Sequence, residues 1–127
     1  MNQGHTIFQQ LVSFLPGREF RRRAERYQGN AGSRRLSCWD QYLAMAFAQL
    51  TYRESLRSIE ACLHALGSKH YHLGFRGKVA RSTLAHANEN RDGRIFADFA
   101  QVPIGFVRPA LIACPIRCAS SVWAFMR

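Results

Sequence analysis

Acidic residues are scarce in this chain, and none follows Asp98. The 127 residues include 18 Lys and Arg against 8 Asp and Glu, which gives a formal net charge of +10. A surplus of this size indicates a polyanionic partner, and nucleic acid is favoured over an anionic membrane surface. The alternative at this point is a soluble protein that is merely basic.

Long hydrophobic runs are also missing, since no run reaches the roughly 18 residues that a transmembrane helix needs. The N-terminus, MNQGHTIFQQ, lacks the basic flank and continuous apolar core of a signal peptide. These absences predict a cytoplasmic protein without a membrane segment, in which thiols stay reduced. The four cysteines form no C-x-x-C pair, and Cys38 and Cys62 fall within helical patterns. They are expected to be buried free thiols. A zinc site built with His70 and His72 is the disfavoured alternative, and no cofactor is expected.

Strand-like alternation of apolar and polar residues is absent as well, which leaves an all-α fold, a compact helical bundle of about one domain's size. Apolar residues at helical spacing predict helices over residues 6–16, 18–28, 38–52, 55–66, 80–91 and 94–102.

Several of these segments have a clear apolar face. The first should turn Ile7, Phe8, Leu11, Val12 and Leu15 inward, and the third Trp39, Tyr42, Leu43, Ala46, Phe47 and Leu50. Ser37 and Asp40 form an S-x-x-D pattern that should cap the third helix. In residues 18–28, the pairs Glu19–Arg23 and Arg21–Glu25 are spaced for ion pairs worth a few tenths of a kcal/mol each.

Residues 55–66 and 80–91 could form a helix–turn–helix unit, in which the second helix enters the major groove of DNA. Their connection of about 13 residues is longer than the usual turn, so the unit would be a variant. Val79, Leu84 and Ala87 are available for the core, which leaves a polar outer face. The alternative is an ordinary solvated surface helix.

On that face, Arg81 could bridge guanine O6 and N7, and Asn88 could pair with adenine, because each side chain offers two suitably spaced groups. Ser82, Thr83 and the flanking cations suit phosphate oxygens. The predicted DNA-contacting residues are Arg76, Lys78, Arg81, Ser82, Thr83, His86, Asn88 and Arg91.

The last part of the chain differs from the rest in composition and in the spacing of its apolar residues. Prolines recur at positions 103, 109 and 115, and the apolar residues there follow no clean period. The prediction is a helical domain over residues 1–102 followed by an irregular tail over 103–127. The change in composition also suggests a shift of reading frame near Arg108.

Four stretches carry a family resemblance: FQQLVSFLPGREFRRRAERYQGN, SCWDQYLAMAFAQLTYRESLRSIEACL, YHLGFRGKVARSTLAHANENRD and RIFADFAQV. In wording and order they resemble the N-terminal domain of bacterial insertion-sequence transposases of family four, the DDE type. The resemblance implies a domain that recognises the element's terminal inverted repeats. It also implies that a following RNase H-like domain, with three carboxylates and divalent metal, cuts and joins the DNA.

The chain departs from that family in two respects. No acidic residue follows Asp98, so the first catalytic aspartate is missing, and Asp40, Asp92 and Asp98 match no catalytic motif of the family. Two-metal chemistry needs such carboxylates, so no catalysis is expected. Ala80 also stands where a capping hydroxyl residue is expected, which could weaken that helix start by about 1 kcal/mol.

The expected function is therefore DNA binding by a transposase N-terminal portion that recognises the terminal inverted repeats and lacks the catalytic domain. The expected partner is double-stranded DNA. A homodimer is a further possibility that the sequence leaves undecided. The alternatives are a non-functional transposase remnant and a basic helical protein that binds nucleic acid without sequence specificity.

Overall fold

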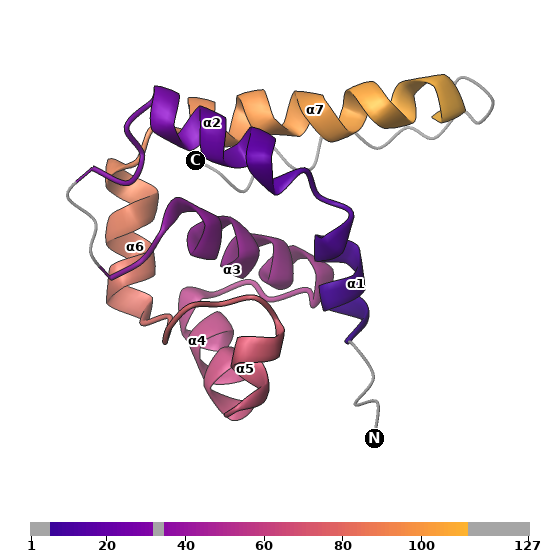
Figure 1. Ribbon diagram of the computed structural model, residues 1–127. Helices are drawn as coiled ribbons and strands as arrows, with labels where there is room; N and C mark the ends of the chain where they lie inside the picture. Colours follow the sequence, from indigo (N-terminus) through magenta and orange to yellow (C-terminus); the bar gives the residue numbers. More distant parts are fainter. Residues whose placement is uncertain (1–5, 32–34, 112–127) are drawn as a thin grey trace.

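The computed structural model describes residues 6–31 and 35–111, with side chains up to Gly105. Every regular element in these ranges is an α-helix, so the predicted all-α class is confirmed. The helices are α1 (Ile7–Ser13), α2 (Gly17–Arg26), α3 (Cys38–Leu50), α4 (Leu56–Ala65), α5 (Lys69–His72), α6 (Arg81–Asn90) and α7 (Arg94–Leu111). In Figure 1, α2 and α7 lie together on one side of α3, and α4 and α5 lie on the other. Helix α6 closes one end of this arrangement, and α1 lies at the other end.

Helix α3 separates two hydrophobic cores. One core gathers residues of α3, α4 and α6 with the segment between α5 and α6, and it includes Leu43, Ile59, Leu63 and Leu84. The other joins α2, the start of α3 and α7, and it is built on Phe20, Cys38, Ile95, Phe96 and Phe99. Because α3 is covered on two sides, it buries more than one stripe of residues.

The predicted inward face of α3 is therefore only partly right. Leu43 is fully buried as expected, but Leu50 is 54% exposed and the predicted aromatics are only partly buried. The buried residues of α3 are Cys38, Asp40, Gln41, Leu43, Ala44 and Ala48. A single-stripe pattern could not show this, because the second cover comes from α2 and α7, which lie far away in the sequence.

The capping prediction for α3 is confirmed. The Ser37 hydroxyl oxygen accepts a hydrogen bond from the Asp40 backbone N–H at 3.0 Å, and it donates to Asp40 Oδ2 at 2.7 Å. The other carboxylate oxygen, Oδ1, accepts from the backbone N–H of Arg76 at 3.3 Å. Asp40 is only 4% exposed, so this carboxylate ties the chain after α5 to the start of α3.

The first two helices follow the prediction in part. Phe20 and Ala24 of α2 are buried, and Glu19 pairs with Arg23 at 2.9 Å as expected. Glu19 also pairs with Arg22 at 3.2 Å, whereas the predicted pair of Arg21 and Glu25 is not formed. In α1, Phe8 and Val12 pack against the core, but Ile7 and Leu11, predicted to face inward, are 78% and 47% exposed. Helix α1 lies at the end of the bundle, and within the described residues its packed side is the one that carries Phe8 and Val12.

The prediction of an irregular tail from residue 103 is wrong as far as Leu111, because α7 continues through Pro103. This proline has no N–H to donate to the Phe99 carbonyl, so the helix loses one backbone hydrogen bond there. The first turns of α7 are anchored by Ile95, Phe96 and Phe99 in the core. Residues 112–127, including Cys114 and Cys118, lie outside the described part. None of the described helices is both long and apolar enough to cross a membrane.

Candidate nucleic-acid interface

Helices α4 and α6 pack against each other as the predicted helix–turn–helix variant requires. Ile59 and Leu63 of α4 share a core with Leu84 and Ala87 of α6, and Val79 just before α6 joins the same core. The prediction that Val79, Leu84 and Ala87 face inward is confirmed. The connection is not a simple turn, since it contains α5 and reverses direction at Gly67, where φ is +51°.

The outer face of α6 presents Arg81, Ser82 and His86 to solvent, with Thr83 partly buried beside them. Glu89 is exposed as well, and it lies about one helical turn beyond His86 and about two turns beyond Ser82, on the same face. The prediction from sequence left Glu89 out, although its position on the same face follows from helical spacing. A carboxylate repels phosphate, but it can accept a hydrogen bond from the cytosine amino group.

Two predicted contact residues form hydrogen bonds with α3 and the chain before it. The Arg91 guanidinium donates to the backbone carbonyls of Leu36 and Ser37 and, at 2.7 Å, to Gln41 Oε1. Asn88 Oδ1 accepts from Gln41 Nε2 at 2.7 Å. Gln41 belongs to α3 and is 3% exposed. Because it bonds to both side chains, it holds Asn88 and Arg91 against α3. Asn88 and Arg91 thus fasten α6 to α3 in this structure, although Asn88 is also exposed. Their predicted contacts with DNA stay predictions.

The two flanking cations also lie apart from each other. Arg76 lines a hollow between α2 and the start of α3, whereas Lys78 lines a different one beside α4 and α5. The structure therefore does not bring the eight predicted residues into one continuous surface. It keeps Arg81, Ser82, Thr83 and His86 together on α6 and separates the remainder.

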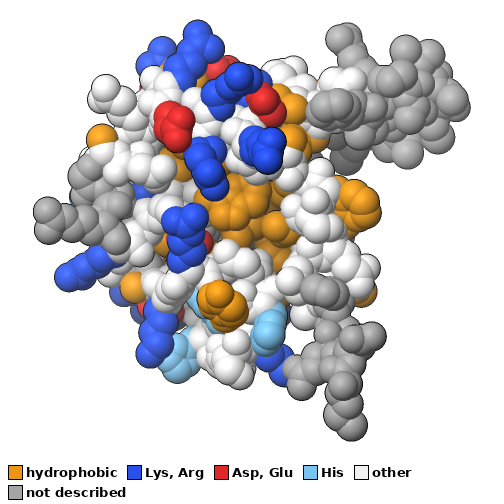
Figure 2. Space-filling model, in the orientation of Figure 1, with side chains coloured by type: hydrophobic (Ala, Val, Ile, Leu, Met, Phe, Trp, Pro, Cys, Tyr) orange, Lys and Arg blue, Asp and Glu red, His pale blue; other side chains and the backbone are white. Residues whose placement is uncertain are grey.

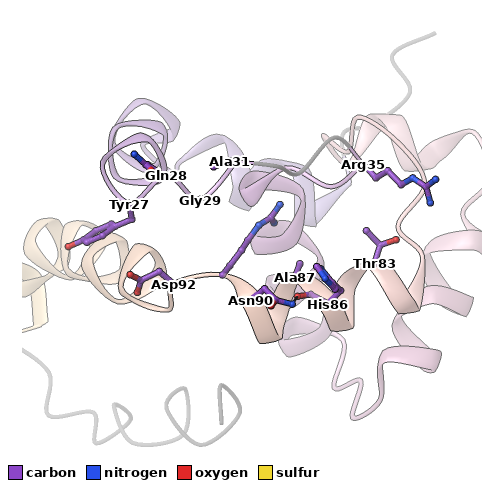
Figure 3. A pocket seen from close by; sticks show the side chains of 11 residues that line it. Tyr27, Gln28, Gly29, Ala31, Arg35, Thr83, His86, Ala87, Asn90 and Asp92 are labelled. Carbon is purple, nitrogen blue, oxygen red and sulfur yellow. Dashed lines mark hydrogen bonds between the residues drawn. The ribbon is translucent and has the colours of Figure 1, made fainter.

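Part of the outer face of α6 opens into a cleft of about 630 Å³, called the α6 cleft here. One wall is α6, and the opposite wall is the chain that follows α2, as Figure 3 shows. Side chains on the α6 wall are Thr83, His86 and Asn90, and those on the opposite wall include Tyr27, Gln28 and Arg35. At the rim, the Tyr27 hydroxyl donates to Asp98 at 2.5 Å, and this hydrogen bond raises the pKa of Tyr27.

The amino end of α6 is capped from another helix. Ala80 provides no side-chain cap, as predicted, but Glu60 Oε1 of α4 accepts from the Arg81 backbone N–H at 3.0 Å. A carboxylate at this position also interacts favourably with the helix dipole. The backbone N–H groups of Ser82 and Thr83 make no hydrogen bond within the described residues. These two groups remain available to an anion.

Glu60→Ala is expected to lower the free energy of unfolding by about 1 kcal/mol, the usual effect of losing a helix cap. Adding Ala80→Ser to this variant should restore most of that loss, because the serine hydroxyl can accept from the next backbone N–H groups. Glu60→Gln keeps an acceptor and should cost less than Glu60→Ala. Urea unfolding followed by circular dichroism measures all three. If Ala80→Ser stabilises the protein but Glu60→Ala has no effect, the contact between helices contributes nothing.

In the described part of the chain, no three His, Cys, Asp or Glu side chains gather to hold an ion. Cys38 is a buried free thiol as predicted, and burial raises its pKa. Cys62 is free but only partly buried. The ring of His70 stacks on Phe75, with centroids 4.6 Å apart, so this histidine packs as part of the structure.

Comparison with known protein families matches residues 3–76 to a domain of unknown function, DUF4372. No curated protein and no solved structure matches the chain. The matched residues include α1 to α5 and end at Arg76, before α6 begins. They make up more than half of the chain, so the chain belongs to the family of the domain of unknown function DUF4372.

Proposed function

We propose that this chain is the DNA-binding N-terminal portion of an insertion-sequence transposase, that it recognises the element's terminal inverted repeats, and that it does not catalyse strand transfer. The observation that carries the proposal is the α4–α6 pair. Helix α6 rests on α4 through a shared apolar core, and its first turns present Arg81, Ser82 and His86 to solvent. The net charge of +10 supports a polyanionic partner.

In the proposed complex, the first turns of α6 enter the major groove. Arg81 reads a guanine, because its planar guanidinium can bridge O6 and N7. The unpaired backbone N–H groups of Ser82 and Thr83 and the Ser82 hydroxyl hold a phosphate at the helix start. The DNA backbone is contacted, without any reading of bases, by the arginines at positions 21 to 23 of α2 and by Arg76 and Lys78.

The test compares a base-reading residue with a phosphate-binding one. Arg81→Ala should cost roughly 1–3 kcal/mol on the specific site and relax the preference at one base pair. Lys78→Ala should weaken binding to all sequences alike and reduce the salt slope by about 1. The specific site is first obtained by selection from a random DNA pool, and each variant is then titrated against matched and scrambled duplexes at several salt concentrations.

Arg22→Ala is the control, because Arg22 is an exposed α2 residue, paired with Glu19, and far from α6 in the sequence. It should change affinity slightly and sequence preference not at all. If Arg81→Ala keeps the fold and leaves preference unchanged, α6 does not read the groove. If selection recovers no preferred sequence, the protein binds nucleic acid without specificity, which is the second candidate function favoured by the net charge.

A further inference from the structure

A second hollow, of about 450 Å³, lies between α2, the start of α3 and the chain at Gly74–Arg76. We call it the α2–α3 hollow. Figure 2 shows hydrophobic surface exposed below α2, with Lys or Arg side chains beside it. The residues that matter for its chemistry are Phe20, Arg21, Glu25, Asn30, Trp39 and Arg76. Its volume is within the range of about 300–1,000 Å³ that is usual for small-ligand sites.

The floor of the α2–α3 hollow is aromatic and rigidly held. The rings of Phe20 and Trp39 meet edge to face with centroids 5.0 Å apart, and Trp39 stacks on Tyr42 at 5.7 Å. Trp39 is nevertheless only partly buried, and its indole N–H makes no hydrogen bond within the described residues. Since no buried polar side-chain atom in those residues lacks a partner, this N–H reaches solvent. The hollow therefore offers an indole that Tyr42 supports by stacking and that solvent still reaches in part, at its N–H among other atoms.

Cations flank this floor from two directions. Arg21 comes from α2 and Arg76 from the chain before α6, and both side chains are exposed. Neither forms an ion pair within the described residues, in contrast to Arg23, which pairs with Glu19. Glu25, also on the wall, forms no ion pair there. An apolar aromatic floor between two available guanidinium groups suits a ligand that is planar in one part and anionic in another.

We propose that the α2–α3 hollow binds one unpaired nucleotide of a DNA strand. The base stacks against Trp39, and the phosphates on either side of it contact Arg21 and Arg76. Bases inside a duplex cannot reach such a floor, so the nucleotide must come from a single strand or leave the stack. Because every base has a π face, binding should tolerate any sequence, unlike recognition by α6. The proposal rests on the proposed DNA-binding function and adds a second contact to it.

The experiment uses the full chain with Trp123→Phe, so that Trp39 is the remaining tryptophan. Oligothymidylate, the selected duplex, the same duplex with a short thymidine overhang, and thymidine monophosphate are each titrated while tryptophan emission is recorded. Oligothymidylate and the overhang should quench the emission, and the overhang should raise affinity about tenfold over the blunt duplex, as expected for a stacked base. Arg21→Ala and Arg76→Ala should each weaken oligothymidylate binding several-fold.

Arg18→Ala is the matched control, since Arg18 lies on the same helix, is exposed and does not line the hollow. A loss with Arg18→Ala equal to that with Arg21→Ala would overturn the proposal. So would quenching by thymidine monophosphate as strong as that by the oligonucleotide, because the occupant would then be a free nucleotide. Specific duplex binding without quenching or overhang preference would refute this site and leave the proposed function standing. Overhang preference without any preferred duplex sequence would support the site and count against the proposed function.

Discussion

Arg91→Ala is expected to lower the free energy of unfolding by roughly 2–4 kcal/mol, since it removes several charge-assisted hydrogen bonds at once. The guanidinium joins the carbonyls of Leu36 and Ser37 to Gln41 Oε1. Without it, the amide oxygen of Gln41, which is 3% exposed, loses its donor and pays the desolvation cost of a buried polar group. The free energy of unfolding of Arg91→Lys should lie between that of the unaltered protein and that of Arg91→Ala, because an ammonium cannot reproduce the planar, forked geometry of the guanidinium. Urea unfolding measures the difference.

Arg94→Ala is the comparison for this result. Arg94 lies close in sequence but is exposed, and its ion pair is with Asp92 at 2.6 Å. An exposed pair of this kind contributes at most about 1 kcal/mol. Equal stability of Arg91→Ala and the unaltered protein would show that the Arg91 contacts are dispensable, and Arg91 would return to the set of residues available to DNA.

Gly29→Ala is expected to destabilise the protein by about 3 kcal/mol, at the upper end of the usual cost of overpacking a core. A Cβ at this position would lie 2.4 Å from Ile95 Cδ1 and 2.6 Å from Cys38 Sγ. Both neighbours are 0% exposed, and they belong to α7 and α3, so neither can turn away into solvent. The absence of a side chain at Gly29 therefore allows the chain after α2 to pack closely against α3 and α7.

A double variant tests this explanation. Ile95→Val removes the Cδ1 atom, so Gly29→Ala combined with Ile95→Val should cost less than the sum of the two single changes, which is the mark of residues in direct contact. Gly17→Ala is the control, because a Cβ there meets nothing within 4 Å, and it should be neutral or slightly stabilising. Strict additivity of the double variant, measured by thermal and urea unfolding, would contradict the steric explanation.

The positions of the helices were predictable from the sequence because they depend on local spacing. The predicted cap at Ser37 acts over one turn, and the structure has it. Which neighbours pack against a helix could not be predicted in this way, because they come from distant parts of the sequence. The spacing of apolar residues in α3 indicated one buried stripe, whereas neighbours on two sides bury Cys38 and Ala44 as well.

The candidate site was harder to predict for the same reason. A polar residue at the end of a helix is normally predicted to lie on the surface. Nothing near Arg91 in the sequence indicates that its hydrogen-bond partners are the carbonyls of Leu36 and Ser37. The sequence did show that Ala80 cannot cap α6. It did not show that Glu60 accepts a hydrogen bond from the first turn of α6, because Glu60 belongs to another helix. Arg81, Ser82 and His86 were placed correctly on the outer face because their exposure follows from helical spacing alone.

The two cores that flank α3 also bear on where this protein can be divided. Residues 3–76, the part shared with the family, contribute Ile59 and Leu63 to one core and Phe20 and Cys38 to the other. Both cores are completed only by residues beyond 76, through Leu84 and Ala87 of α6 and Ile95 and Phe99 of α7. A fragment ended at the family boundary would leave apolar surface open on both sides of α3. The segment that the family model matches is thus shorter than the segment that builds the two cores.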